Sequence, residues 1–224
     1  MIKFGQLSTA FALVSSFRPP ATGFFFRDFA SKSFVGTGRF SMGSDTQEET
    51  KLASGAPEWI ELHSDKSKAE LVRTSEVEWK ATSQAGGVYR KMIERQGTEK
   101  VARATTIVKF SPNQSFPRHV HDGGEEFLVL DGVWKDDYGD FGKYSYIRNY
   151  IGSGHTPSIG EEGCVILVKL RQMSLLSKGE PEHKNWGELT PDQVSNKGWA
   201  EEDGTKQVPL FSSPLESTSV RLLP

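Results

Sequence analysis

Two histidines separated by one residue, His119 and His121, are the clearest candidates for chemistry in this chain. In an extended strand, side chains two positions apart point to the same face, so both imidazoles can reach one centre. An Asp-Gly-Gly turn follows and brings a carboxylate of the next strand back beside them. Far downstream, His155 can complete a site of three imidazoles and one carboxylate. These ligands suit zinc, iron, manganese, nickel or copper, and ligand type alone does not choose among them.

The alternative is that His119 and His121 are ordinary exposed histidines of a loop. The chain has five histidines, and three of them fall in this arrangement. Glycines stand where the turn needs them. The apolar run from Phe127 to Leu130 is typical of a buried strand, which we expect Gly132 to end. These features together favour a metal site.

Two motifs in this region resemble those of the cupins. The pattern His-x-His-x3-Glu-x6-Gly, from His119 to Gly132, matches the first cupin motif. The second surrounds His155, with Tyr150 where the family usually has proline and Ile159 where it often has asparagine. The longer stretch from about residue 79 to residue 173 is similar to the ChrR-like cupins in particular. That subgroup includes the metal-binding domain of a zinc-containing anti-sigma factor.

The resemblance implies a set of metal ligands. Carried over by position, these are His119, His121, Glu125 and His155. Glu126 competes for the carboxylate position, because apolar residues follow on both faces of the strand and alternation does not decide between the two acids. The spacing of the motif favours Glu125 and leaves Glu126 behind the ligands or at the rim.

The resemblance also implies two functions, which differ in the metal. One divalent ion per chain is expected, held so that a six-coordinate metal keeps two open positions. With Fe(II) the protein would be a dioxygenase acting on a small diketone or hydroxyketone. Zn(II) has no redox chemistry, and a closed zinc site would favour a non-catalytic sensor or ligand-binding module.

The dioxygenase interpretation requires side chains that contact the substrate. We predict Arg148 and Tyr150 as the catalytic pair, with Arg148 polarising a carbonyl and Tyr150 lining the cavity. Further candidates are Arg118 and Gln172 for the carbonyl and Phe127, Trp134 and Tyr146 for the cavity. Ordinary packing in the core or at the rim is the alternative for each aromatic residue.

Composition limits the partners and the compartment. A net charge of −2 gives no reason to expect nucleic acid. No apolar run reaches the roughly 18 residues that a membrane span needs. The single cysteine, Cys164, excludes an intrachain disulfide, fits a reducing compartment, and is expected to be a small buried hydrophobe. A small-molecule substrate or ligand is the expected partner, and pairing through edge strands makes a homodimer the default for a cupin.

Residues 1–44 have a different character from the rest of the chain. They are basic, rich in serine and poor in acids, which is typical of a transit peptide to a mitochondrion or plastid. The apolar stretch from Leu7 to Phe17 could serve as a short signal core. A start at Met42 would give a cytoplasmic form, and a merely disordered terminus is the alternative.

The remaining chain divides into three parts. Residues 45–56 read as a polar linker, and residues 57–175 show short strand-like runs between turns, typical of an all-β protein. We expect a single cupin domain here, a jelly-roll β-barrel, with strands near 59–62, 69–77, 87–95, 101–110, 144–150 and 165–173. Residues 176–224 are expected to form an irregular extension that packs on the barrel. One interpretation is the remnant of a second cupin repeat, with an exposed His183, a short helix capped by Thr190 and one or two final strands.

Overall fold

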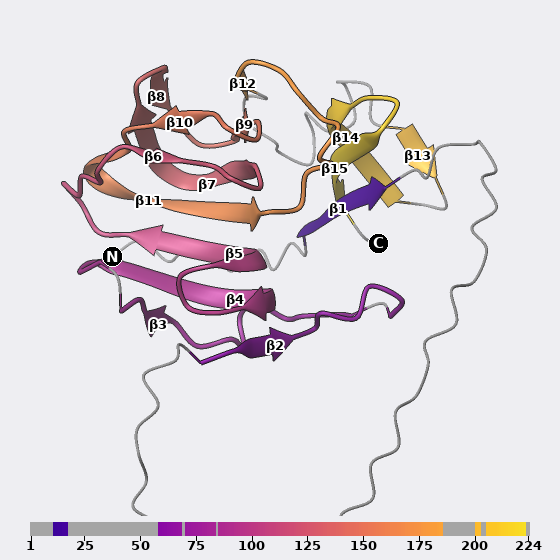
Figure 1. Ribbon diagram of the computed structural model, residues 1–224, viewed down its shortest axis with the longest axis horizontal. Helices are drawn as coiled ribbons and strands as arrows, with labels where there is room; N and C mark the ends of the chain where they lie inside the picture. Colours follow the sequence, from indigo (N-terminus) through magenta and orange to yellow (C-terminus); the bar gives the residue numbers. More distant parts are fainter. Residues whose placement is uncertain are drawn as a thin grey trace, which may run out of the picture.

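Figure 1 shows the computed structural model of the protein, which describes residues 11–17, 58–68, 70–83, 85–185, 200–202 and 205–222. The described residues contain strands and no helix, and therefore no helix that could cross a membrane. The expected presequence, linker and Thr190 helix lie outside these ranges, except that Phe11–Phe17 form strand β1. The antiparallel strands confirm the all-β cupin class expected from the sequence.

The largest unit is an antiparallel sheet in the order β12-β9-β7-β11-β5-β4-β2, with β3 paired to β4 and β8 paired to β7. Its strands are β2 (Ile60–Leu62), β3 (Lys80–Ala81), β4 (Val88–Gly97), β5 (Ala102–Phe110), β7 (Glu125–Asp136), β8 (Gly139–Phe141), β9 (Ser145–Asn149), β11 (Ser158–Leu170) and β12 (Glu182–Asn185). A two-stranded sheet of β6 (His119–Val120) and β10 (Gly154–His155) lies near β7 and β8 (Figure 1).

A second antiparallel sheet has the order β1-β15-β14-β13. It contains β13 (Ala200–Glu202), β14 (Thr205–Ser212) and β15 (Glu216–Leu222), so the expected final strands are confirmed. Leu210, Phe211 and Val220 of this sheet pack against Leu128 and Tyr146 of the large sheet. The C-terminal strands therefore cover part of the large sheet.

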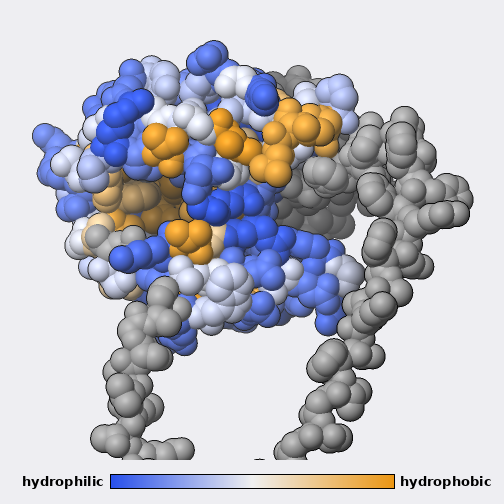
Figure 2. Space-filling model, viewed as in Figure 1, coloured by the Kyte–Doolittle hydropathy of each residue, from blue (hydrophilic) through white to orange (hydrophobic). Residues whose placement is uncertain are grey.

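Strand alternation gives the large sheet two faces. Phe127 and Val129 of β7 are fully buried, and they pack with apolar residues of β9 and β11 in the main core. We call this side the inner face. The intervening Leu128 points to the other side, the outer face, where it meets the C-terminal strands. The hydropathy surface in Figure 2 is hollowed between the upper strands and β5, with apolar side chains inside the hollow.

A row of polar and charged side chains crosses the outer face. Cross-strand pairing connects these residues in the order Glu94, Thr105, Lys169, Glu126 and Arg148. Lys169 Nζ lies 3.3 Å from Glu126 Oε1, and Arg148 Nη1 lies 2.9 Å from Glu126 Oε2. We call this set the outer charged row. Its charges alternate in sign, so the desolvation cost of burying each charge is offset by attraction to a neighbour of opposite sign.

The C-terminal strand β15 closes the outer charged row. Arg148 forms a second ion pair with Glu216, and Thr218 Oγ1 donates to Glu126 Oε2 at 2.9 Å. Burial alone would raise the pKa of the Glu126 carboxyl, but Lys169, the Tyr146 hydroxyl and Arg148 hold that pKa below its ordinary value. Glu126 is therefore a buried anion of the outer face and does not lie at the rim of the site.

Three local expectations from the sequence are wrong. Residues 70–77 form turns and irregular structure without strand pairing. Gly132 does not end its strand, because β7 continues to Asp136 through a register shift against β11. His183 belongs to β12 and is half-buried, with its ring stacked 4.6 Å from that of Phe141. The chain after β11 thus adds an edge strand to the large sheet where sequence indicated a loop.

Gly132 is expected to resist substitution. Its φ is +71°, and a Cβ built there would lie 2.1 Å from the carbonyl oxygen of Gly163. Because that neighbour is backbone, Gly132→Ala should lower the free energy of unfolding by more than about 2 kcal/mol. Gly142→Ala is the control, since a Cβ there meets nothing within 4 Å. Chemical denaturation of both variants measures the difference, and equal stabilities would contradict the prediction.

Candidate metal centre

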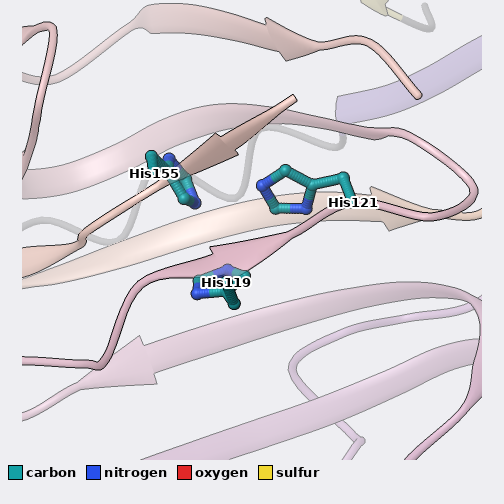
Figure 3. Close-up of side chains that lie close together, drawn as sticks. All are labelled: His119, His121 and His155. Atoms are coloured by element: carbon teal, nitrogen blue, oxygen red, sulfur yellow. The ribbon is translucent and has the colours of Figure 1, made fainter. Parts of the chain in front are cut away.

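The structure brings the three predicted histidines together. His119 and His155 are directly paired residues of β6 and β10, and His121 follows β6. One ring nitrogen from each histidine lies within 4.8 Å of the other two. Figure 3 shows the three side chains close together, His119 from β6, His155 from β10 and His121 from the residue after β6. The spacing of two between His119 and His121 therefore places both imidazoles on one side, as expected.

Glu125 supplies the carboxylate beside the imidazoles. Its Oε2 lies 3.5 Å from His121 Nε2 and 3.7 Å from His155 Nε2. Asn149, the directly paired residue of β9, donates from Nδ2 to the same oxygen at 3.1 Å. Glu126 points to the outer face. The structure thus places Glu125, and not Glu126, next to the histidines.

The unused nitrogens of the imidazoles fit a bound cation. Nε2 of His121 and Nε2 of His155 are both buried and without a hydrogen-bond partner. Leaving buried polar atoms unpaired is costly, and a metal ion at the centre would satisfy both. Burial also lowers the pKa of His121, which favours the neutral imidazole that binds metals. The donor set and its orphaned atoms therefore fit a divalent transition metal.

Asp136, at the end of β7, fixes the orientation of His155. Its Oδ2 lies 3.0 Å from His155 Nδ1, while the indole of Trp134 donates to the same oxygen at 3.1 Å. Burial would raise the pKa of Asp136, but hydrogen bonds from His155, the backbone of Tyr138 and Trp134 hold that pKa below its usual value. An ionised carboxylate on Nδ1 leaves Nε2 to face the metal position.

Asp136 was not among the predicted site residues. The sequence marks it only as the first residue of an Asp-Asp-Tyr-Gly-Asp turn, and nothing local connects that turn to His155. The connection requires β7 to extend past Gly132 as far as the turn, which the sequence did not indicate.

Removing the charge of Asp136 should weaken metal binding. Carboxylates that hold a ligating histidine typically contribute about 10- to 100-fold in metal affinity, so Asp136→Asn should raise the dissociation constant by that factor. Asp140→Asn is the control, because Asp140 is exposed and pairs with Lys135. Competition with a chromogenic chelator measures both affinities. An unchanged affinity in Asp136→Asn would exclude this orienting role.

Access to the centre is asymmetric. His119 is exposed, whereas His121 and His155 are buried. On the buried side the Trp134 ring lies 5.8 Å from that of His155 and 4.8 Å from that of Phe127. Of the aromatic residues expected around the cavity, Phe127 and Trp134 lie on the inner face, and Tyr146 belongs to the outer-face cluster. The centre thus has an aromatic wall and one side open to solvent.

The structure does not support Arg148 and Tyr150 as catalytic residues. The Arg148 guanidinium is 1% exposed and is held on the outer face by Glu126 and Glu216. Tyr150 donates its hydroxyl to Glu182 at 2.6 Å and packs with Phe211 in the outer-face cluster. Residues 148 and 149 alternate across β9, so Asn149, and not Arg148, takes the inner position, and the catalytic roles of Arg148 and Tyr150 stay predictions.

The other polar candidates are also engaged elsewhere. Arg118 forms an exposed ion pair with Asp137, with 2.8 Å between Nη1 and Oδ2. Gln172 donates from Nε2 to the backbone oxygen of Ala104 at 2.8 Å and to Thr105 Oγ1 at 2.9 Å. Neither contacts the histidines through any described hydrogen bond.

Comparison with known proteins agrees with the geometry. Residues 67–174 match the family model of the ChrR cupin-like domain. A search of the curated proteins found no match. Among solved structures, the anti-sigma ChrR of Rhodobacter sphaeroides, solved in complex with SigE, is 25% identical with a TM-score of 0.36. That match covers 44% of this chain and 51% of the other, so it spans about half of the ChrR chain.

Two further structures are more distant in sequence. A candidate dioxygenase from Nostoc punctiforme PCC 73102 is 17% identical, with coverage of 63% of this chain and 55% of that chain and a TM-score of 0.43. The polyketide cyclase RemF from Streptomyces resistomycificus is 18% identical, with coverage of 58% and 94% and a TM-score of 0.38. Structural likeness at this level says nothing of the reaction. The family match includes all four predicted ligands, and residues 67–174 of this chain are similar to the ChrR cupin-like domain.

Proposed function

We propose that the protein is a metal-dependent dioxygenase that binds one Fe(II) through His119, His121, Glu125 and His155 and acts on a small diketone or hydroxyketone. The observation that carries the proposal is the pair of buried, unpartnered Nε2 atoms of His121 and His155 beside Glu125 Oε2. The exposed side of His119 supports access of a small molecule to the same centre.

Each residue around the centre would have a separate role in this reaction. When bound, Fe(II) would supply the redox chemistry that these side chains lack. Asp136 keeps His155 in one tautomer, and Asn149 holds the Glu125 carboxylate in place. Phe127 and Trp134 keep water away from the buried side of the centre. A substrate would enter past His119, where the site is open.

A closed zinc site is the second candidate function. Three imidazoles and one carboxylate are enough for a tetrahedral zinc without an open position, which suits sensing or structure. The short distances from Glu125 Oε2 to both buried imidazoles favour such a compact arrangement.

Metal analysis of the full chain, purified without oxygen or chelator, separates these functions. About one iron per chain together with oxygen consumption on small diketones supports the dioxygenase. One zinc per chain that iron does not replace, with no oxygen consumption, supports the sensor. Protein that binds neither metal after incubation with each would refute both.

A further inference from the structure

The inner face of β4 carries a buried arginine in line with the metal centre. Directly paired residues of antiparallel strands share a face of the sheet. Such pairs connect Arg95 to Glu125 by way of Ala104 and Leu170. Arg95 therefore faces the same side of the sheet as the carboxylate of the metal centre, and it is only 4% exposed.

A second arginine lies on the same face of β4. Arg90 is paired with Val108, which packs against the main core, so it too points inward. Strict alternation would place residues 90 and 95 on opposite faces. A β-bulge between Met92 and Glu94 shifts the register by one residue, and this shift turns Arg95 to the inner face while Glu94 stays on the outer one.

The two arginines share a single carboxylate. Glu99, from the turn after β4, forms an ion pair with Arg90. Arg95 forms no salt bridge with any described residue, and its Nη2 donates only to the backbone oxygens of Thr98 and Glu99. Nε of Arg90 and Nε of Arg95 are both buried and without a partner. One buried positive charge and two donors are thus left unmatched.

A bound anion would compensate this excess of buried positive charge. An unpaired buried cation is costly. Burial and the neighbouring charge of Arg90 lower the pKa of Arg95, and Glu99 only partly offsets them. The planar guanidinium has the donor geometry that matches a carboxylate. We propose that Arg95, assisted by Arg90, binds a carboxylate group of the substrate on the inner face of the barrel.

The distance between the two sites limits the size of this ligand. Arg95 and Glu125 are three strand positions apart, which corresponds to roughly 14 Å between backbones at about 4.8 Å per strand. A carboxylate several carbons from the reacting ketone would therefore fit. Only the statement that the ligand is the substrate rests on the proposed function; the carboxylate site itself does not.

Titration calorimetry with hexanoate and its uncharged amide, hexanamide, tests the site in the full chain. Wild-type protein should bind hexanoate at least about tenfold more tightly than hexanamide, and Arg95→Gln should lose that preference. Arg103→Gln is the matched control, because Arg103 lies on the neighbouring strand but pairs with Glu94 on the outer face. Hexanoate binding no tighter than hexanamide binding in the wild type would overturn the proposal, as would full retention of the preference in Arg95→Gln.

A second variant covers the case in which Arg95→Gln does not fold. Glu99→Gln keeps both arginines and removes the carboxylate that competes for Arg90, so it should bind hexanoate several-fold more tightly than the wild type. Unchanged or weaker binding in Glu99→Gln would contradict the site. Metal content is an independent readout. Hexanoate binding through Arg95 in a protein that takes up no metal would support the carboxylate site and contradict the dioxygenase. Iron binding without any preference for hexanoate would support the dioxygenase and contradict the carboxylate site.

Discussion

Replacement of His121 by alanine is expected to lower the metal affinity by about 100-fold and the melting temperature by about 5 to 11 °C. Apparent binding free energies of structural metal sites reach about 10 to 16 kcal/mol over four ligands, so one lost ligand costs a few kcal/mol. A 100-fold weaker site loses about 2.7 kcal/mol of stabilisation at the same metal concentration. A protein of this size shifts by about 2 to 4 °C for each kcal/mol.

His63→Ala is the matched control for this experiment. His63 is exposed and lies just after β2, and among the described residues its side chain is hydrogen-bonded through Nδ1 to the backbone oxygen of Ile93 at 2.7 Å. It should keep the wild-type metal content and its metal-dependent increase in melting temperature. Mass spectrometry of bound metal and thermal unfolding with and without added metal provide both readings. Full occupancy and an unchanged melting temperature in His121→Ala would show that the metal centre is elsewhere.

Arg148→Ala should cost about 3 to 5 kcal/mol of unfolding free energy without changing metal binding. The substitution leaves Glu126 and Glu216 as buried carboxylates with fewer partners, and breaking a buried ion pair on one side has a cost of this size. The metal centre lies on the opposite face of the sheet, so its ligands should be unaffected. Denaturant unfolding and metal analysis of the same protein sample measure the two effects.

Arg118→Ala is the control that distinguishes the loss of a buried ion pair from the loss of an exposed one. Arg118 also forms an ion pair, with Asp137, but both side chains are exposed, and such pairs contribute at most about 1 kcal/mol. Its stability should stay close to that of the wild type. A fully stable Arg148→Ala protein that has lost turnover would return Arg148 to the catalytic role first expected from the sequence.

The sequence predicts the grouping of the three histidines well because their positions follow local rules. The alternation of a strand places His119 and His121 together, and the spacing of the motif identifies Glu125. The all-β class follows from short apolar runs separated by turns. These features depend on a few neighbouring residues, and the tertiary structure does not override them.

The sequence fails where the answer depends on pairing between distant strands. Whether Arg148 or Asn149 points inward is set by the register of β9 against β7, which no local pattern reveals. The role of Asp136 depends on β7 passing through Gly132 without ending there. Similarly, only the bulge in β4 turns Arg95 to the inner face. Asn149, Asp136 and Arg95 are ordinary members of polar stretches when the sequence is considered alone.

The outer charged row connects the family-matched region to the C-terminal strands. The family match stops at residue 174, yet Glu216 and Thr218 supply partners for Arg148 and Glu126 beyond that boundary. A fragment cut at residue 174 would retain every predicted metal ligand, but Arg148 would lose its Glu216 partner and the apolar side chains of Leu128 and Tyr146 would lose their cover. The segment that matches the family and the segment that buries the outer face therefore differ in length, and we expect stable folding to require the longer one.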